Sequence, residues 1–188
     1  RGLACAVGGS LGCGCTGNQR VILARKNDCS PVLPKGSQMS DCYEPRAERG
    51  TIQSGPNHTL GATRVHMEGD AGKSGHDRFP GFTAIDLNRS GVPLIEIVSE
   101  PEMRSSAEAG AYLRALREIL LYAEVSDCSM EEGSLRVDAN VSARLHGETE
   151  LRTRTDIKNL NTFSNAARAL PLEFIPHCEV PRARCAVV

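Results

Sequence analysis

The sequence has almost no net charge: 22 lysines and arginines stand against 23 aspartates and glutamates, which leaves a formal charge of −1. A chain without a basic excess has no overall positive field of the kind that drives non-specific nucleic-acid binding. Any contact with RNA or DNA must therefore be local.

The sequence also lacks a long apolar run. No stretch approaches the roughly 18 apolar residues of a membrane-spanning helix, and the opening residues RGLACAVGGSLGCGC contain no signal-peptide hydrophobic region. The eight cysteines include no CxxC pair, so their spacing fits neither a zinc ribbon nor a disulfide framework. We expect a soluble protein with free thiols and no membrane contact.

What the sequence does have, from about Leu60 onward, is the period-two alternation of β-strands. The clearest example is residues 135–144, and residues 151–158 follow it as the second strand of an antiparallel hairpin. GVPLIEIVSEP is apolar on both faces except at Glu96 and Glu100, as in a buried central strand. We predict that residues 63–70, 92–98, 134–144 and 151–158 lie in one mainly antiparallel sheet.

One amphipathic helix is predicted from Ser105 to Val125, where Ser105 and Glu108 form a capping box. Residues 1–59 are rich in Gly, Pro, Ser and Cys, so we expect loops there and little of the core. Strands and a helix without repeated βαβ alternation indicate an α+β domain built on an antiparallel sheet.

The predicted strands place charges of both signs on one face, which is either a solvent face with cross-strand ion pairs or a site. Glu96 favours a site, because its strand is too apolar for an edge. Carboxylates from different strands suit a Mg²⁺ ion that also binds substrate phosphates. We predict that one face gathers the carboxylates of Glu68, Glu96, Asp138 and Asp156 near the turn that carries Lys73.

Two glycine motifs are weaker. Gly12, Gly14 and Gly17 form a GxGxxG, but no strand–turn–helix context surrounds it, which leaves nicotinamide binding as a remote alternative. The turn DAGKSGHD contains Gly72, Lys73 and Ser74, which match the end of a Walker A motif. The first glycine of that motif would fall five residues before Gly72, where this sequence has Met67. The N–H groups of the turn could still hold phosphate, and a plain surface turn is the alternative.

Four long motifs resemble the B subunit of the aspartyl/glutamyl-tRNA amidotransferase, the GatB/GatE family. They are RVHMEGDAGKSGHD, IDLNRSGVPLIEIVSEPEMRSSAEA, SMEEGSLRVDANVSAR and RTRTDIKNLNTFSNAARAL, with a weaker match at RKNDCSPVLPKGSQMSDCYEP. The resemblance implies a cradle domain like the glutamine synthetase catalytic fold, whose polar face holds Mg²⁺ and ATP. It implies amidation of Glu-tRNA(Gln) or Asp-tRNA(Asn) together with the amidase (A) and small (C) subunits, in the bacterial cytoplasm or a mitochondrial or plastid matrix.

The resemblance also assigns residues. Glu96 matches a family metal ligand, and Glu68 and Asp70 stand within the acidic motif of the family, so these three are the expected metal ligands. From its place on the charged face we add Asp156 to Glu96 as an expected catalytic residue. We assign nucleotide binding to Lys73, Arg136 and Arg154 on the same charged face.

Departures from the family pattern motivate a second hypothesis, an inactive fragment or isoform that keeps the fold and a docking surface. Gly69 stands where the family has a metal-binding glutamate, and the family's Glu-x-His strand has no counterpart in residues 1–24. We therefore expect weak or no binding of Mg²⁺ and ATP, and stronger binding after Gly69→Glu, unless the turn requires glycine.

The expected organisation is an unmatched segment over residues 1–24, an incomplete catalytic cradle over 25–170 and a divergent end over 171–188. In that last segment Pro171, Pro176 and Pro181 are expected to interrupt the helix. We expect residues 1–188 to include no counterpart of the domains that grip tRNA in this family.

Overall fold

The computed structural model describes residues 2–15 and 22–179. The α+β class is confirmed, since helices occur beside antiparallel strands. The chain divides into two compact units, Arg1–Thr51 with Gly61–Glu100, and Ile52–Leu60 with Pro101–Val188. No described helix is both long and apolar enough to cross a membrane.

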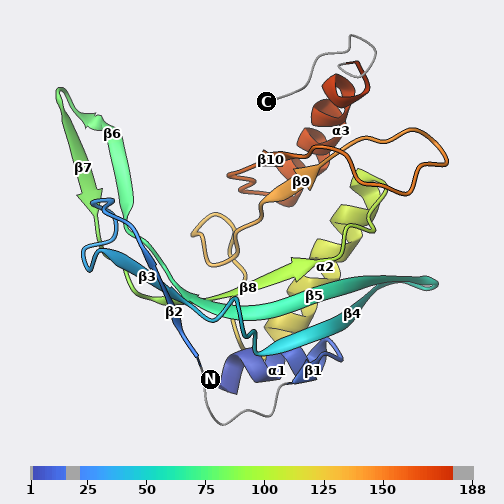
Figure 1. Ribbon diagram of the computed structural model, residues 1–188, viewed down its shortest axis with the longest axis horizontal. Helices are drawn as coiled ribbons and strands as arrows, with labels where there is room; N and C mark the ends of the chain where they lie inside the picture. The colour runs from blue at the N-terminus through green and yellow to red at the C-terminus, as the bar shows by residue number, and fades with distance from the viewer. Residues whose placement is uncertain (1, 16–21, 180–188) are drawn as a thin grey trace. The chain divides into compact units, whose positions relative to one another are not determined.

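A six-stranded antiparallel sheet organises the first unit, although residues 52–60 of its long hairpin belong to the second unit. Along the sheet the strand order is β1-β4-β5-β3-β2, and β8 pairs with β5 (Figure 1). The strands are β1 (Gly14–Cys15), β2 (Ala24–Asn27), β3 (Ser37–Ser40), β4 (Ala47–Gly55), β5 (His58–Gly69) and β8 (Pro93–Ser99). Strand β5 therefore lies at the centre.

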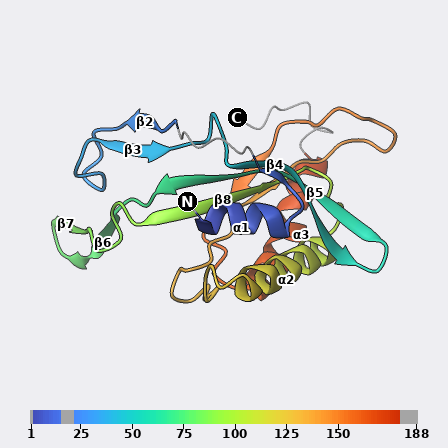
Figure 2. The ribbon, with the colours of Figure 1, turned by 90° about the horizontal axis from the view of Figure 1, so that it is seen from below.

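Helix α1 (Gly2–Ser10) lies against one face of this sheet (Figure 2). Val7 and Leu11 are buried, and the Leu11 carbonyl accepts a hydrogen bond from the Thr51 N–H at 2.8 Å. Gly50 of β4 permits this approach, because a Cβ there would lie 2.2 Å from Cys13 Sγ. The expectation of loops over residues 1–59 is thus wrong: small residues make α1 apolar all round, which hides the helical period.

Strands β5 and β8 pair antiparallel as predicted, with His66 opposite Glu96 and Glu68 opposite Leu94. Among the described strands β8 pairs only with β5, and none of its residues is fully buried, so the expectation of a buried central strand around Glu96 is wrong. A β-bulge lies between Ala62 and Arg64, where β5 carries one extra residue. The bulge shifts the alternation, so that Ala62 and Val65 are both buried on the same face despite their odd spacing. Residues 64, 66 and 68 then share the opposite face.

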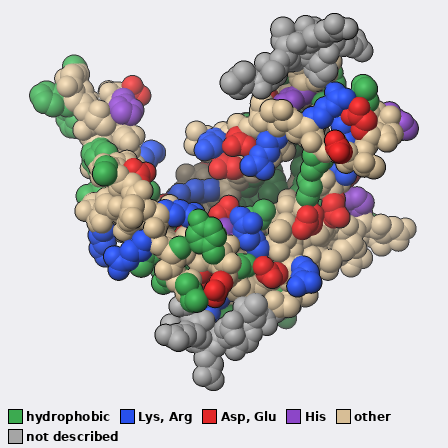
Figure 3. Space-filling model, in the orientation of Figure 1, with side chains coloured by type: hydrophobic (Ala, Val, Ile, Leu, Met, Phe, Trp, Pro, Cys, Tyr) green, Lys and Arg blue, Asp and Glu red, His purple; other side chains and the backbone are tan. Residues whose placement is uncertain are grey.

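A separate hairpin of β6 (Lys73–Phe79) and β7 (Phe82–Asp86) follows β5. It extends beyond the sheet in Figure 1, and hydrophobic side chains are exposed along it (Figure 3). Phe82 is among the most exposed of them.

In the second unit, helices α2 (Ser106–Tyr122) and α3 (Phe163–Glu179) pack together. The predicted helix is confirmed, and so is half of its capping box, since the Glu108 N–H donates to Ser105 Oγ at 3.2 Å. The Glu108 carboxylate accepts from Ser105 Oγ and from the Arg104 N–H, one residue before the N-cap. The buried residues of this unit include Tyr112, Leu116, Leu120, Leu160 and Ala166.

The predicted hairpin over residues 134–158 forms, but only β9 (Ala139–Val141) and β10 (Thr155–Ile157) pair. They make their own two-stranded sheet, so the prediction that all four segments share one sheet is wrong. Alternation itself holds, because Val137 and Val141 are half-buried while Arg136 and Asp138 are exposed. The period of a strand fixes its faces and leaves its pairing partner open.

The expectation that prolines interrupt the last helix is also wrong over the described residues. Helix α3 passes through Pro171 and Pro176, each of which removes one backbone hydrogen bond. Pro181 lies outside the described residues.

A buried carboxylate fastens the segment after β3 to β5. Asp41 is 1% exposed, accepts a hydrogen bond from the Met67 N–H, and lies 3.1 Å from Arg46 Nε. The Asp41 N–H donates to the Met67 carbonyl, and the Arg46 N–H to the Val65 carbonyl. These bonds hold β5 in place on both sides of His66.

We predict that Asp41→Ala lowers the free energy of unfolding by about 3–5 kcal/mol, the usual effect of removing one partner of a buried ion pair. Urea denaturation followed by circular dichroism measures the change. Asp28→Ala is the control, since Asp28 is exposed and accepts only the local Ser30 N–H among the described contacts. Equal effects of the two substitutions would contradict the role given to Asp41.

Candidate metal centre

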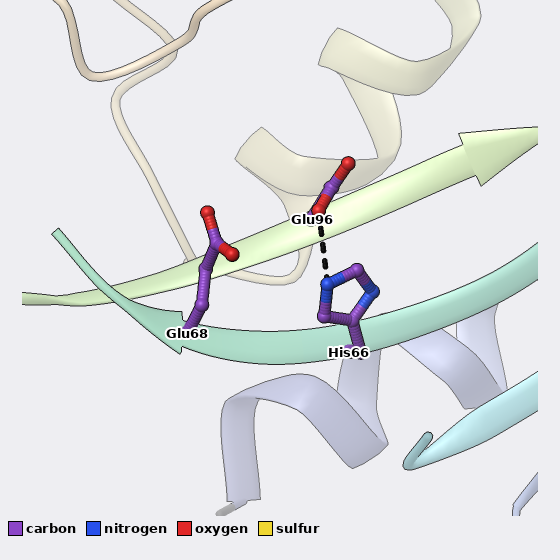
Figure 4. Close-up of side chains that lie close together, drawn as sticks. All are labelled: His66, Glu68 and Glu96. Carbon is purple, nitrogen blue, oxygen red and sulfur yellow. Dashed lines mark ion pairs between the residues drawn. The ribbon is translucent and has the colours of Figure 1, made fainter. Parts of the chain in front are cut away.

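Three side chains converge on one face of the paired strands β5 and β8. His66 and Glu68 are two residues apart on β5, and Glu96 projects from β8 opposite His66 (Figure 4). One possible ligand atom from each side chain lies within 4.8 Å of the other two. Helix α1 lies on the other side of β5 (Figure 4), so the cluster faces away from the apolar contacts of that helix.

His66 and Glu96 form the closest contact of the cluster, with 2.9 Å between His66 Nε2 and Glu96 Oε2. His66 is 1% exposed, whereas the Glu96 side chain is 51% exposed. The pKa of the Glu96 carboxyl is lowered, first by its hydrogen-bonding contact with His66. Burial acts in the opposite direction and raises this pKa, whereas the charges of His66, Arg64 and Lys26 lower it further. Glu96 is therefore an ionised carboxylate at neutral pH.

The contact leaves the imidazole poorly satisfied. Despite the short distance to Glu96, neither ring nitrogen of His66 makes a well-directed hydrogen bond to another described residue. A buried polar group without such a partner costs free energy. A ligand that bound His66 and the two glutamates together would remove that cost.

The donor set fits a divalent cation. Two carboxylates from different strands match the one or two that Mg²⁺ usually takes, with water and phosphate completing its shell. The imidazole adds a nitrogen ligand of the kind preferred by transition metals, so Mn²⁺ is a suitable probe of the same site. A cation here would be bound by Glu68 and Glu96, with His66 as a third ligand or as the group that orients Glu96.

Asp70, the remaining predicted metal ligand, is used elsewhere. Its Oδ2 lies 3.1 Å from Arg89 Nε, and its Oδ1 accepts the Ala71 N–H at 2.9 Å. It is 5% exposed. The structure therefore brings Glu68 and Glu96 together and gives Asp70 a structural ion pair.

The glycine turn before Lys73 has its N–H groups occupied. Ala71 donates to Asp70, and Gly72 donates to the Val32 carbonyl at 2.8 Å. A Cβ at Gly72 would lie 2.8 Å from the Asp86 carbonyl oxygen, so glycine serves close packing there. Lys73 is exposed at the start of β6. These contacts favour the plain structural turn over a phosphate cradle.

The other predicted site residues belong to the second unit. Asp156 on β10 is exposed and pairs with Arg154 at 3.9 Å, and Asp138 is exposed ahead of β9. Arg136 Nε donates to the Gly133 carbonyl at 3.4 Å. The approach of Asp138 and Asp156 to Glu96, and nucleotide binding by Arg136 and Arg154, stay predictions.

The predicted ligand set does not include His66, although the sequence contains a signal for it. In a strand, residues i and i+2 share a face, so a His-x-Glu pair presents two ligands together. Here that pair is His66 and Glu68.

Gly69 is sterically ordinary. It pairs with Pro93 at the end of β5, and a Cβ there would lie 3.9 Å from its nearest neighbour, Gly91 Cα. Its backbone does not require glycine, so that alternative is wrong. Alternation, however, sets position 69 on the face opposite Glu68. The expectation that a glutamate at this position adds a ligand is therefore not supported.

Comparison with known proteins gives one consistent family. A family model described as the GatB/GatE catalytic domain matches residues 1–182. The B subunit of the aspartyl/glutamyl-tRNA(Asn/Gln) amidotransferase of Chlorobium chlorochromatii is 54% identical over 162 residues, covering 85% of this chain and 34% of that protein. The proteins of the same name from Thiobacillus denitrificans and Chlorobium phaeobacteroides are 51% and 49% identical, over 90% and 95% of this chain and 36% and 38% of their own lengths. The chain thus spans about a third of the length of these relatives.

We predict that Gly69→Glu folds normally and leaves Mn²⁺ affinity unchanged, because its side chain faces away from the cluster. Thermal unfolding and a Mn²⁺ titration followed by electron paramagnetic resonance test both parts. Glu68→Gln, one residue away on the site face, should weaken Mn²⁺ binding by about 10-fold or more. Tighter Mn²⁺ binding by Gly69→Glu would show that position 69 does reach the cluster.

We predict that Glu96→Gln destabilises the metal-free chain at neutral pH and that this effect disappears in acid. The folded pKa of Glu96 lies below its ordinary value of 4.5, so ionisation stabilises the folded state above that pH. The contribution is lost as the pH falls through the lowered folded pKa. Urea denaturation with a chelator, from pH 7 down to about 3, compares the two proteins. A difference independent of pH would rule out ionised Glu96 as the cause.

Proposed function

This chain belongs to the GatB/GatE catalytic domain family, and from this premise we propose that it is the catalytic part of the B subunit of an aspartyl/glutamyl-tRNA amidotransferase. The proposed reaction converts Glu-tRNA(Gln) or Asp-tRNA(Asn) to the corresponding amide for translation. The single observation that carries a catalytic role for this chain is the convergence of His66, Glu68 and Glu96.

The proposed chemistry has two steps. The side-chain carboxylate of the aminoacyl group attacks the terminal phosphate of ATP, which releases ADP and gives an acyl phosphate. Ammonia then attacks the acyl carbon, and inorganic phosphate leaves as the amide forms. A carboxylate is a poor electrophile, and the phosphate supplies the missing leaving group. When bound, Mg²⁺ would neutralise negative charge on the phosphates of ATP during transfer of the terminal one.

The residues of this chain contribute mainly by position and charge. Glu68 and Glu96 present ionisable oxygens from adjacent strands, and the pairing of β5 with β8 fixes their separation. The buried His66 ring limits the movement of the Glu96 carboxylate through their 2.9 Å contact. Such fixed groups stabilise developing charge without reorganising during the reaction.

The proposed partners follow from the reaction. Free ammonia must come from a glutamine-hydrolysing protein, for which the amidase (A) subunit is the candidate, with the small (C) subunit joining the two. The aminoacyl-tRNA is the substrate. The bacterial relatives support a cytoplasmic site, where translation takes place.

The alternative, an inactive docking module, rested on Gly69, on the missing Glu-x-His strand and on the divergent ends of the sequence. Alternation removes position 69 from the count of missing ligands, and His66 adds a donor that the sequence pattern alone did not single out. Three potential ligands then remain on one face. We therefore favour a chain that binds a divalent cation and nucleotide.

Calorimetric titration of ATP with Mg²⁺ into the purified chain tests the proposal. We expect Mg²⁺-dependent binding that Glu96→Gln and Glu68→Gln each weaken by about 10-fold or more. Glu100→Gln is the matched control, since Glu100 follows β8 and is not part of the cluster. A folded wild-type chain that binds no nucleotide in the presence of Mg²⁺ would overturn the proposal.

A further inference from the structure

Two cationic side chains flank the cluster on the same face of the sheet. Lys26 on β2 has its Nζ 4.0 Å from Glu68 Oε2, and Arg64 on β5 lies two residues before His66. Arg64 pairs across the strands with Val98, which makes Glu96 its diagonal neighbour, within reach of a long side chain. Each glutamate of the cluster therefore has a cation beside it.

The two cations differ in how firmly they are held. The Lys26 side chain is 45% exposed, so its ammonium group is mobile and hydrated. Arg64 is half-buried, and its Nε is fully buried with no hydrogen-bond partner among the described residues. Arginine carries five N–H donors, and the one on Arg64 Nε has no acceptor among the described residues.

The charges of this face balance only while the cation site is empty. Without a bound cation, the positive charges of Lys26 and Arg64 offset the negative charges of Glu68 and Glu96. A divalent cation bound by the two glutamates would neutralise their two negative charges. Lys26 and Arg64 would then lack counter-charges, and the face would carry a net positive charge.

We propose that Lys26 and Arg64 form a phosphate-binding subsite that becomes available when a divalent cation occupies the His66–Glu68–Glu96 cluster. The ligand is the terminal phosphate end of a nucleoside triphosphate, a multiply charged anion that contacts the cation and both side chains. Arg64 gives directed donors from one side, and Lys26 a mobile charge from the other. This inference rests on the proposed function and adds residues to it that the family match did not single out.

Coupling between the two ligands follows from the charge balance. The bound cation raises the affinity for phosphate, and by linkage phosphate raises the affinity for the cation by the same factor. Removing either positive side chain should therefore act oppositely on the two ligands. The cation alone should bind as well or better, because a neighbouring like charge is gone, and the triphosphate should bind more weakly.

The test compares Arg64→Met and Lys26→Met with the wild-type chain. Mn²⁺ binding without nucleotide is measured by electron paramagnetic resonance, and binding of ATP and AMP in the presence of Mg²⁺ by calorimetry. We expect unchanged or tighter Mn²⁺ binding, ATP binding weakened by about 10- to 100-fold for Arg64→Met, and a smaller effect on AMP. Arg64→Lys should recover part of the loss.

The outcomes separate the two proposals. A wild-type chain that binds neither Mn²⁺ nor ATP overturns both of them. Methionine variants that both bind ATP as tightly as the wild-type chain overturn the phosphate subsite alone. Arg64→Met could also lose Mn²⁺ binding and ATP binding together and have a lower melting temperature. That result would overturn the phosphate subsite if Lys26→Met, on an exposed side chain, binds ATP normally.

Discussion

The antiparallel pairing of β5 with β8 sets His66 directly opposite Glu96, and this register determines what the sheet can hold. Side chains alternate along a strand, so a slip of one residue would turn Glu96 toward the apolar face. The bulge at Ala62 and Arg64 acts in the same way on β5, because it restores Val65 to the buried face. One extra residue thus decides which side chains reach the candidate metal centre.

The segment that carries the cluster is fastened from its other edge as well. Asp41 binds the Met67 N–H, and Gln38 Nε2 donates to the Gly69 carbonyl at 2.8 Å, so β3 and the loop after it hold the end of β5 on both sides of Glu68. A buried histidine that lacks a well-directed hydrogen bond needs such support, since local rearrangement would otherwise let it reach water. The contacts from β3 and the loop after it thus fall on residues 65–69, the part of β5 that carries His66 and Glu68.

The sequence allowed the local features to be predicted and left the long-range choices open. Alternation located β5, an apolar run located β8, and Ser105 with Glu108 located the start of α2, because all three signals are local. The separation of β9 and β10 into their own sheet depends on pairing partners, which periodicity does not encode. The ion pair of Asp70 with Arg89 is a similar long-range choice, because the motif around Asp70 does not show which distant residue contacts its carboxylate.

The residues around the cluster also explain how the domain can be stable before any ligand binds. Two glutamates close together would repel each other, and the contacts with His66, Lys26 and Arg64 reduce that repulsion and lower the pKa of Glu96. A cation that replaces these contacts leaves two positive side chains in place, already arranged around it. Because the groups that neutralise the empty site are also the groups that would receive an anion, the fold needs no large rearrangement to pass from one state to the other.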